Sequence, residues 1–299
     1  YRPHTKLKST YVDGLMKVID PDGRVRTSFQ MTATATGRLS STEPNLLNIP
    51  TRTELGSQLR RMFTAGEGCV LVDADYSQIE LRLLAHISGD EAMRESFLSG
   101  TDFHTATAAR VFHVAECEVT PELRRRAKAV NFGVVYGISA FSLSQDIGVS
   151  VAEGREYMER YFETYSTLRQ YMTDVVVQAE QDGYVQTMMH RRRALPELKS
   201  SNHNLREFGK RVALNMPVQG TAADIMKLAM VRVHDRLRRE GLRGRLLMQV
   251  HDELIVECPE EEREQVERVL TGEMEHAAEL YVPLTTDVHW GGNWLEAKG

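Results

Sequence analysis

The sequence predicts an α+β fold in which a mainly helical segment is inserted into a domain built on an antiparallel sheet. Three observations support this prediction. Apolar, strand-like runs occur at residues 70–72, 246–250 and 254–256. The last two runs are separated by only three polar residues, which is typical of a tight hairpin. Helical patterns fill most of the chain between the first run and this hairpin.

The composition is that of an ordinary soluble globular protein. The 299 residues are 41% hydrophobic and 26% charged, enough for roughly two domains or subdomains. No apolar run approaches the ~20 residues of a membrane span, and we see no signal peptide. The three cysteines lie far apart without the spacing of a metal finger, which favours a reduced, cytoplasmic setting.

The net charge of -5 argues weakly against a nucleic-acid binder, but the charges are segregated. Residues 188–211 contain seven lysines and arginines against two glutamates. Residues 257–279 contain nine glutamates against two arginines. A basic surface and an acidic surface can therefore coexist, and only the basic one needs to meet phosphates.

The first part of the chain predicts a hairpin and a loop. A turn at Asp20–Gly23 is flanked by apolar residues on both sides, which indicates a β-hairpin. Residues 32–39 are rich in strand-forming residues, and residues 44–50 have the composition of an irregular loop.

Acidic residues follow the apolar run at residues 70–72. On a strand, Asp73 and Asp75 would share one face. Ser77 and Glu80 then have capping-box spacing, so a helix is expected to start there. A carboxylate at the end of a buried strand is costly unless a cation binds it, and Mg²⁺ is one such cation. A purely structural alternative is that the two aspartates cap a strand-to-helix turn.

The helical segment has several start and stop signals. Helices are expected at residues 90–98, 104–112 and 121–136, and another from the capping box Ser150-x-x-Glu153, with helical pattern continuing to residue 181. Pro217 and Gly220 are expected to interrupt the chain before a helix at 221–237, and a late helix is expected near 266–277.

Cations and aromatic rings recur every four residues along the expected helix 121–136. Arg124, Lys128, Phe132 and Tyr136 would form one stripe roughly 18 Å long. The cations could bind phosphates while the rings meet a base and a sugar. The alternative is a helix with a solvated basic end and a packed aromatic end.

The hairpin tip carries a second pair of acids, Asp252 and Glu253. Two acid-bearing strand ends can meet at one edge of a sheet, as a two-metal site for in-line phosphoryl displacement requires. The alternative is a turn-forming Asp252 beside a solvated Glu253.

Three segments together resemble motifs A, B and C of the family A DNA polymerases, with bacterial members the nearest likeness. These segments are residues 75–80, 124–137 and 249–253, and residues 34–40, 45–50 and 215–220 resemble further stretches of the family. The resemblance implies a right-hand polymerase fold, in which a mainly helical fingers insertion interrupts an antiparallel palm sheet. Residues 1–10 would end a truncated thumb, 11–76 and 205–299 would form the palm, and 77–204 the fingers.

The resemblance also implies site residues and cofactors. Asp75, Asp252 and the backbone carbonyl of Tyr76 would hold two Mg²⁺ ions, for which Mn²⁺ can substitute, with Glu253 as a nearby secondary carboxylate. Lys128 would act in catalysis and bind the triphosphate. The nucleotide site would comprise Arg124, Lys128, Phe132, Tyr136, His104, Gln78, Glu80 and Tyr76. Glu80 would exclude a ribose 2′-hydroxyl, a role compatible with a place in a capping box.

The implied partners are dNTPs and primer–template DNA, bound by a monomer in the bacterial cytoplasm. The implied DNA contacts are Arg38, Asn45, Asn48, Arg52, Arg211, Asn215, Gln219, Gln249 and His251. His251 could instead be a locally bonded turn residue, and the arginines at 191–193 a solvated charge run.

The predicted function is a template-directed DNA polymerase core that adds dNTPs to a primer 3′-hydroxyl and releases pyrophosphate. Three alternatives remain: a single-subunit RNA polymerase, against which Glu80 argues; a two-metal nuclease, which does not need the stripe on helix 121–136; and a non-catalytic DNA-binding remnant, which does not need Asp75 and Asp252.

Overall fold

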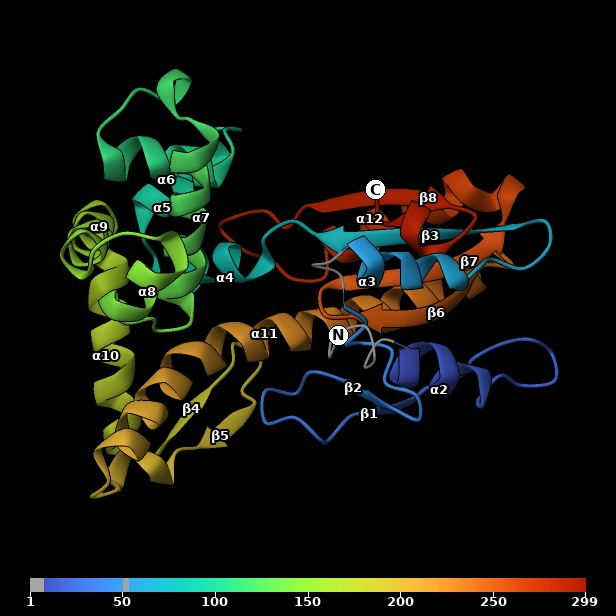
Figure 1. Ribbon diagram of the computed structural model, residues 1–299, viewed down its shortest axis with the longest axis horizontal. Helices are drawn as coiled ribbons and strands as arrows, with labels where there is room; N and C mark the ends of the chain where they lie inside the picture. The colour runs from blue at the N-terminus through green and yellow to red at the C-terminus, as the bar shows by residue number, and fades with distance from the viewer. Residues whose placement is uncertain (1–7, 51–53) are drawn as a thin grey trace. The chain divides into compact units, whose positions relative to one another are not determined.

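The structure is a computed structural model that describes residues 8–50 and 54–299 (Figure 1). It divides into two compact units. The sheet unit contains the described residues up to Ser77, together with Ala223–Ala278 and Leu284–Gly299. The helical unit contains Gln78–Ala222 and Glu279–Pro283. The predicted α+β class, with a helical insertion in an antiparallel-sheet domain, is confirmed.

The sheet unit is built on four antiparallel strands in the order β6-β7-β3-β8 (Figure 1). Their bounds are β3 (Cys69–Tyr76), β6 (Arg245–Val250), β7 (Glu253–Pro259) and β8 (Thr286–Gly291). Strand β3 lies between β7 and β8 and is buried along most of its length. The predicted strand and the predicted hairpin are therefore confirmed, whereas β8 was not predicted.

Short elements complete the sheet unit. Besides part of α11 (His203–Arg239), its helices and remaining strands are the π-helix η1 (Lys8–Val12), α2 (Asp13–Met16), β1 (Ser28–Gln30), β2 (Ser40–Thr42), α3 (Glu54–Gln58), η2 (Leu59–Met62), η5 (Glu260–Glu262), α12 (Arg263–Glu275) and α13 (Trp294–Ala297). The late helix expected near residues 266–277 is α12, which buries Val266, Val269, Leu270 and Met274.

Two expectations for the first fifty residues need correction. The turn at Asp20–Gly23 forms, but its flanks pair only through one isolated bridge, between Ile19 and Val25. Residues 32–39 are not a strand, because Gly37 adopts a φ of 79° in a turn closed by its amide and the carbonyl of Thr34. The strand in this region is instead β2, which pairs with β1.

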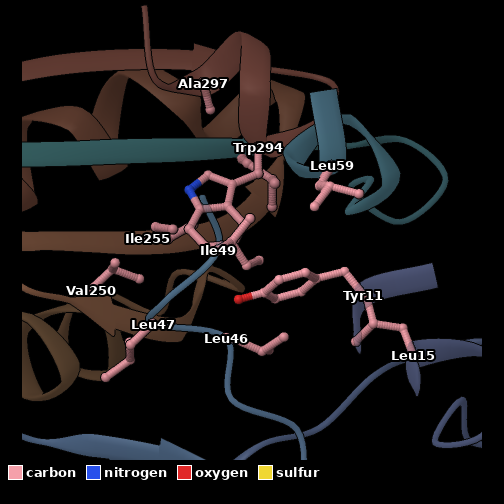
Figure 2. Packing of buried hydrophobic residues seen from close by; sticks show 11 residues of the cluster. Tyr11, Leu15, Leu46, Leu47, Ile49, Leu59, Val250, Ile255, Trp294 and Ala297 are labelled. Carbon is pink, nitrogen blue, oxygen red and sulfur yellow. The ribbon is translucent and has the colours of Figure 1, made fainter. Parts of the chain in front are cut away.

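Trp294 anchors the core that holds α13 against the sheet unit (Figure 2). Its side chain is 1% exposed, its ring meets Phe63 edge-on with centroids 5.6 Å apart, and the Arg60 guanidinium lies 4.4 Å from the ring centroid. Gly291 lets α13 approach β8, since a Cβ there would lie 2.4 Å from the Cβ of Glu296. The position of Lys298, the residue after α13, is therefore fixed by buried packing.

The helical unit contains seven α-helices, two 3-10 helices and a small hairpin within its own bounds, besides part of α11. They are α4 (Ile79–Ser88), α5 (Glu91–Leu98), α6 (Phe103–Phe112), η3 (Glu116–Glu118), α7 (Pro121–Val135), α8 (Ala140–Ile147), α9 (Val151–Thr164), α10 (Ser166–Asp182), β4 (Tyr184–Gln186), β5 (Arg192–Ala194) and η4 (Pro196–Lys199). The predicted helices α5, α6 and α7 are confirmed, as is the capping box at Ser150.

The capping box predicted for Ser77 and Glu80 is wrong. The N-cap of α4 is Gln78, which has a φ of 56° and makes no side-chain cap bond. The Ser77 hydroxyl instead donates to Asp287 on β8, and Glu80 accepts a hydrogen bond from the Tyr136 hydroxyl. Both partners, Asp287 and Tyr136, come from distant parts of the sequence.

The break predicted at Pro217 is also wrong, because α11 (His203–Arg239) runs through it. Proline removes one backbone donor but is compatible with a helix whose faces are well packed. Met216 and Val218 are fully buried, and the Thr221 hydroxyl donates to the Pro217 carbonyl at 2.5 Å. The chain passes from the helical unit to the sheet unit between Ala222 and Ala223, within this helix.

The predicted thumb, palm and fingers assignments stay predictions, and residues 1–7 lie outside the described residues. Within residues 8–50 and 54–299, no helix has the length and apolar character that a membrane crossing requires.

Candidate active site

Four carboxylates gather at one end of the sheet in the sheet unit: Asp73, Asp75, Asp252 and Glu253, here called the acid cluster. Asp75 on β3 lies directly opposite Glu253 on β7, and Asp73 lies two residues back on the same face of β3. Asp73 is 2% exposed and Glu253 is 3% exposed. The strand register therefore concentrates negative charge in a poorly solvated place.

The hairpin tip brings Asp252 to the same end. His251 turns the chain with a φ of 55°, and the amide of Tyr76 donates to the Asp252 carbonyl at 3.0 Å. Burial and the nearby charge of Asp75 raise the pKa of Asp252 to about 7. The structure thus brings together the three acids predicted from the sequence, Asp75, Asp252 and Glu253.

Several oxygens of the acid cluster can accept a cation. Both carboxylate oxygens of Asp73, Oδ1 of Asp75 and Oε1 of Glu253 are buried and have no hydrogen-bond partner among the described residues. Burial and the charge of Glu253 raise the pKa of Asp73 to about 8. Carboxylate oxygens are the donor type that hard divalent ions such as Mg²⁺ prefer, although no three His, Cys, Asp or Glu side chains of the described residues are spaced to hold one ion together.

Lys298 also reaches the acid cluster. Its Nζ lies 2.8 Å from Oδ2 of Asp75 and donates to Oε2 of Glu253 as well. Burial opposes the charge of Lys298, but the carboxylates of Glu253, Asp73 and Asp75 outweigh it and raise the pKa of the lysine. The lysine therefore stays protonated and partly neutralises the cluster.

Tyr76 is held inside the sheet unit. Its side chain is 3% exposed, and its hydroxyl donates to the Met274 carbonyl at 2.7 Å. Burial raises the pKa of this hydroxyl. The backbone of Tyr76 lies at the acid cluster through the hydrogen bond to Asp252. The predicted roles of Tyr76 and Gln78 stay predictions.

Helix α7 carries the predicted phosphate-binding cations in the helical unit. It starts as expected, with Thr120 as N-cap and Pro121 in the first turn. Arg124 makes a bidentate ion pair with Asp102, with both N–O distances 2.9 Å. Lys128, one turn further on, is exposed. A triphosphate that binds Arg124 would therefore have to share or displace Asp102.

His104 is buried on α6 and held by a neighbour on α7. It is 2% exposed, and its Nδ1 lies 2.9 Å from Nδ2 of Asn131. Burial lowers the pKa of His104 to about 4, so the ring is neutral at pH 7. The predicted nucleotide contact of His104 stays a prediction.

This histidine makes the stability of the protein depend on pH. In the unfolded chain His104 takes up a proton near pH 6.5, whereas in the folded protein it does so only near pH 4. The free energy of unfolding therefore falls by about 3 kcal/mol as the pH decreases from 6.5 to 4. The urea midpoint of His104→Gln is expected to depend less on pH in this interval than the midpoint of the wild type. Parallel curves for the two proteins would contradict this expectation.

The aromatic end of α7 lines a cavity in the helical unit. The cavity has a volume of about 440 Å³ and is lined by Phe132, Tyr136 and Arg211, among others. The Tyr136 hydroxyl donates to Oε2 of Glu80 at 2.8 Å, and Glu80 is 8% exposed. Two predicted nucleotide residues and one predicted DNA contact therefore border a single cavity.

The other predicted DNA contacts fall into two groups. Arg211, Asn215 and Gln219 lie four residues apart on α11, so they form one stripe of that helix. In the sheet unit, Gln249 donates to the His251 carbonyl, and the pKa of His251 is lowered by burial and by Arg38. The structure thus brings Arg38, Gln249 and His251 together.

The remaining predicted contacts are less informative. The side chain of Asn45 accepts hydrogen bonds from the amides of Leu47 and Asn48, so it shapes the loop. Asn48 is exposed, and Arg52 lies outside the described residues. Arg191 and Arg192 are exposed at the β4–β5 hairpin, where Arg192 lies 4.6 Å from the centroid of the Tyr184 ring. These DNA contacts stay predictions.

The sequence interpretation missed Lys298 and Arg60. The charge of Arg60 lowers the pKa of Asp73 and of His251, and its side chain is 8% exposed. Nothing in the sequence links either cation to the acids, since Arg60 lies over the Trp294 ring and Lys298 follows the helix that Trp294 begins.

The family model described as DNA polymerase family A matches residues 1–296. DNA polymerase I of Bacillus caldotenax and that of Bacillus subtilis (strain 168) are each 52% identical over 300 residues, covering 100% of this chain and 34% of each relative. The thermostable DNA polymerase I of Thermus aquaticus is 50% identical over 299 residues, covering 100% of this chain and 36% of the relative.

A solved structure is also similar over the whole chain. It is described as "POL domain of Pol1 from M. smegmatis complex with DNA primer-template and dNTP", with a TM-score of 0.95 and 49% identity. The match covers 100% of this chain and 53% of that one. The chain spans about a third of the length of the curated relatives it matches. Because the family model covers nearly all of it, the chain belongs to DNA polymerase family A.

Proposed function

We propose that this chain is a template-directed DNA polymerase core that extends a primer with dNTPs by a two-metal nucleotidyl transfer. The observation that carries the proposal is the acid cluster, where Asp75 and Asp252 lie together and buried carboxylate oxygens lack partners. The relatives named DNA polymerase I, and the similar structure with primer–template DNA and dNTP, support this function. The setting we propose is a monomer in the bacterial cytoplasm, and all three cysteines are free thiols.

Asp75 and Asp252, with the Tyr76 carbonyl, would hold the divalent ions, and Glu253 would assist. When bound, the ions neutralise charge on the attacking and leaving oxygens of an in-line displacement. In that reaction the primer 3′-hydroxyl gives its proton to water and its oxygen bonds to the α-phosphorus. The bond between the α-phosphorus and the oxygen that bridges it to the β-phosphorus breaks, and pyrophosphate leaves.

The residues of α7 would hold the nucleotide during this reaction. Lys128 and Arg124 would bind the triphosphate as fixed cations, which lowers the barrier by positioning and by charge. Phe132 and Tyr136 border a cavity suited to a base and a sugar.

The contact between Glu80 and Tyr136 is proposed to select deoxyribose. The Glu80 side chain, held by the Tyr136 hydroxyl, would occupy the space that a ribose 2′-hydroxyl needs. Glu80→Ala is expected to lower the ratio of kcat/KM for dNTP over NTP at least ~10-fold. Tyr136→Phe, which loses only the hydroxyl, should lower the ratio less. An unchanged ratio in Glu80→Ala would contradict the role of Glu80.

Primer extension tests the function as a whole. A labelled primer on a longer template should grow with Mg²⁺ and four dNTPs, and should stop where a required dNTP is omitted. Preferential extension with NTPs would indicate an RNA polymerase, and shortening of the label without dNTPs would indicate a nuclease. Salt-sensitive DNA binding without extension would indicate a non-catalytic remnant.

A further inference from the structure

Lys298 occupies a position that the proposed chemistry does not use. Its ammonium contacts one oxygen of Asp75 and one of Glu253, and leaves the second oxygen of each without a hydrogen-bond partner among the described residues. Asp73, 2% exposed on the same strand face, has no hydrogen-bond partner for either oxygen. Lys298 therefore contacts two of the crowded acids directly, and its charge acts on the third, Asp73, together with that of Arg60.

The lysine is delivered by a rigid element. Asn293 caps α13 by accepting from the amide of Glu296 at 3.1 Å, and the amide of Trp294 donates to the Phe63 carbonyl at 2.9 Å. Trp294 and Ala297, the first and last residues of α13, are both buried, and Lys298 follows directly. The ammonium is thus held at Asp75 by packing, and it is more than a mobile surface charge.

We propose that Lys298 is a positioning residue that acts as a built-in counter-ion: it holds Asp75 and Glu253 in place before a divalent ion binds, and it weakens the binding of that ion. The inference rests on the proposed role of Asp75 as a metal ligand. A lysine and a divalent cation attracted to one carboxylate repel each other, so each lowers the occupancy of the other.

The signs of two effects follow. Without the lysine, the carboxylates repel one another in the metal-free protein, so Tm in EDTA should fall by about 3–6 °C. The same loss of positive charge should make the cluster bind a divalent ion roughly tenfold more tightly, even with water-like screening. The added ion should then restore Tm in the variant.

The experiment uses Mn²⁺ alone as the probe. Electron paramagnetic resonance follows the signal of unbound Mn²⁺ and gives the Kd, and Tm is measured in EDTA and in Mn²⁺. Lys298→Met should show the lower Tm in EDTA and the tighter Kd for Mn²⁺, whereas Lys298→Arg, which keeps the charge, should resemble the wild type. Lys210→Met is the matched control, because its ammonium pairs with Glu207 on the surface of the helical unit. This control should leave the Kd unchanged.

Asp75→Asn separates failure of this inference from failure of the proposed function. If Asp75→Asn weakens Mn²⁺ binding while Lys298→Met leaves the Kd for Mn²⁺ unchanged or raises it, the counter-ion role is wrong and the metal assignment stands. If neither substitution changes the Kd, both are wrong. An equal fall of Tm with and without Mn²⁺ would make Lys298 a purely structural clamp and would also overturn the proposal.

Discussion

Asp75→Asn and Asp252→Asn are each expected to reduce the rate of primer extension on the order of 10³-fold. Each substitution removes one negative ligand of the proposed ions while keeping the size of the side chain. Loss of several kcal/mol of transition-state stabilisation corresponds to a rate loss of this size. Single-turnover extension in Mg²⁺ measures the effect without interference from product release.

The fold should survive both substitutions, which separates a catalytic loss from unfolding. Burial and Asp75 raise the pKa of Asp252 to about 7, so the charged form of Asp252 is disfavoured in the folded protein. Asp252→Asn should therefore keep or raise Tm above pH 7. Asp174→Asn on the exposed face of α10 is the matched control and should extend normally. Extension by either cluster variant near the wild-type rate would refute the assignment.

Lys128→Met is expected to lower kcat/KM for dNTP by roughly 10²- to 10³-fold. A cation placed at the transferring phosphates stabilises the transition state more than the ground state. In the variant, kcat should therefore fall and KM should rise. Steady-state extension of a single nucleotide gives both constants.

The control for this prediction lies one turn earlier on the same helix. Arg125 is exposed and pairs with Glu122, so Arg125→Met removes the same charge from α7 without touching the proposed triphosphate site. It should change kcat/KM only slightly. Equal losses in the two variants would reduce the effect of Lys128 to general electrostatic attraction of the nucleotide.

Local signals explain what the sequence predicted correctly. The buried strand β3, the hairpin around Asp252 and the start of α7 at Thr120 each follow from an apolar run, a short polar tip or a capping residue within a few positions. The gathering of Asp75, Asp252 and Glu253 follows in turn from antiparallel pairing of these strands.

Tertiary packing explains the errors and omissions. The N-cap of α4 is Gln78, and Ser77 bonds Asp287 on β8, a strand more than 200 residues away. Pro217 stays helical because α11 is buried around it. Lys298 reaches Asp75 only because Trp294 fixes α13 in the core (Figure 2). No pattern within a short window of sequence encodes such contacts.

The most direct test is a count of bound ions in the assembled complex. Mn²⁺ binding can be measured by electron paramagnetic resonance with a primer that ends in a dideoxynucleotide, its template and the matching dNTP. We expect two ions per wild-type chain, and the loss of at least one in Asp75→Asn and in Asp252→Asn. Two equally tight ions in all three proteins would contradict it.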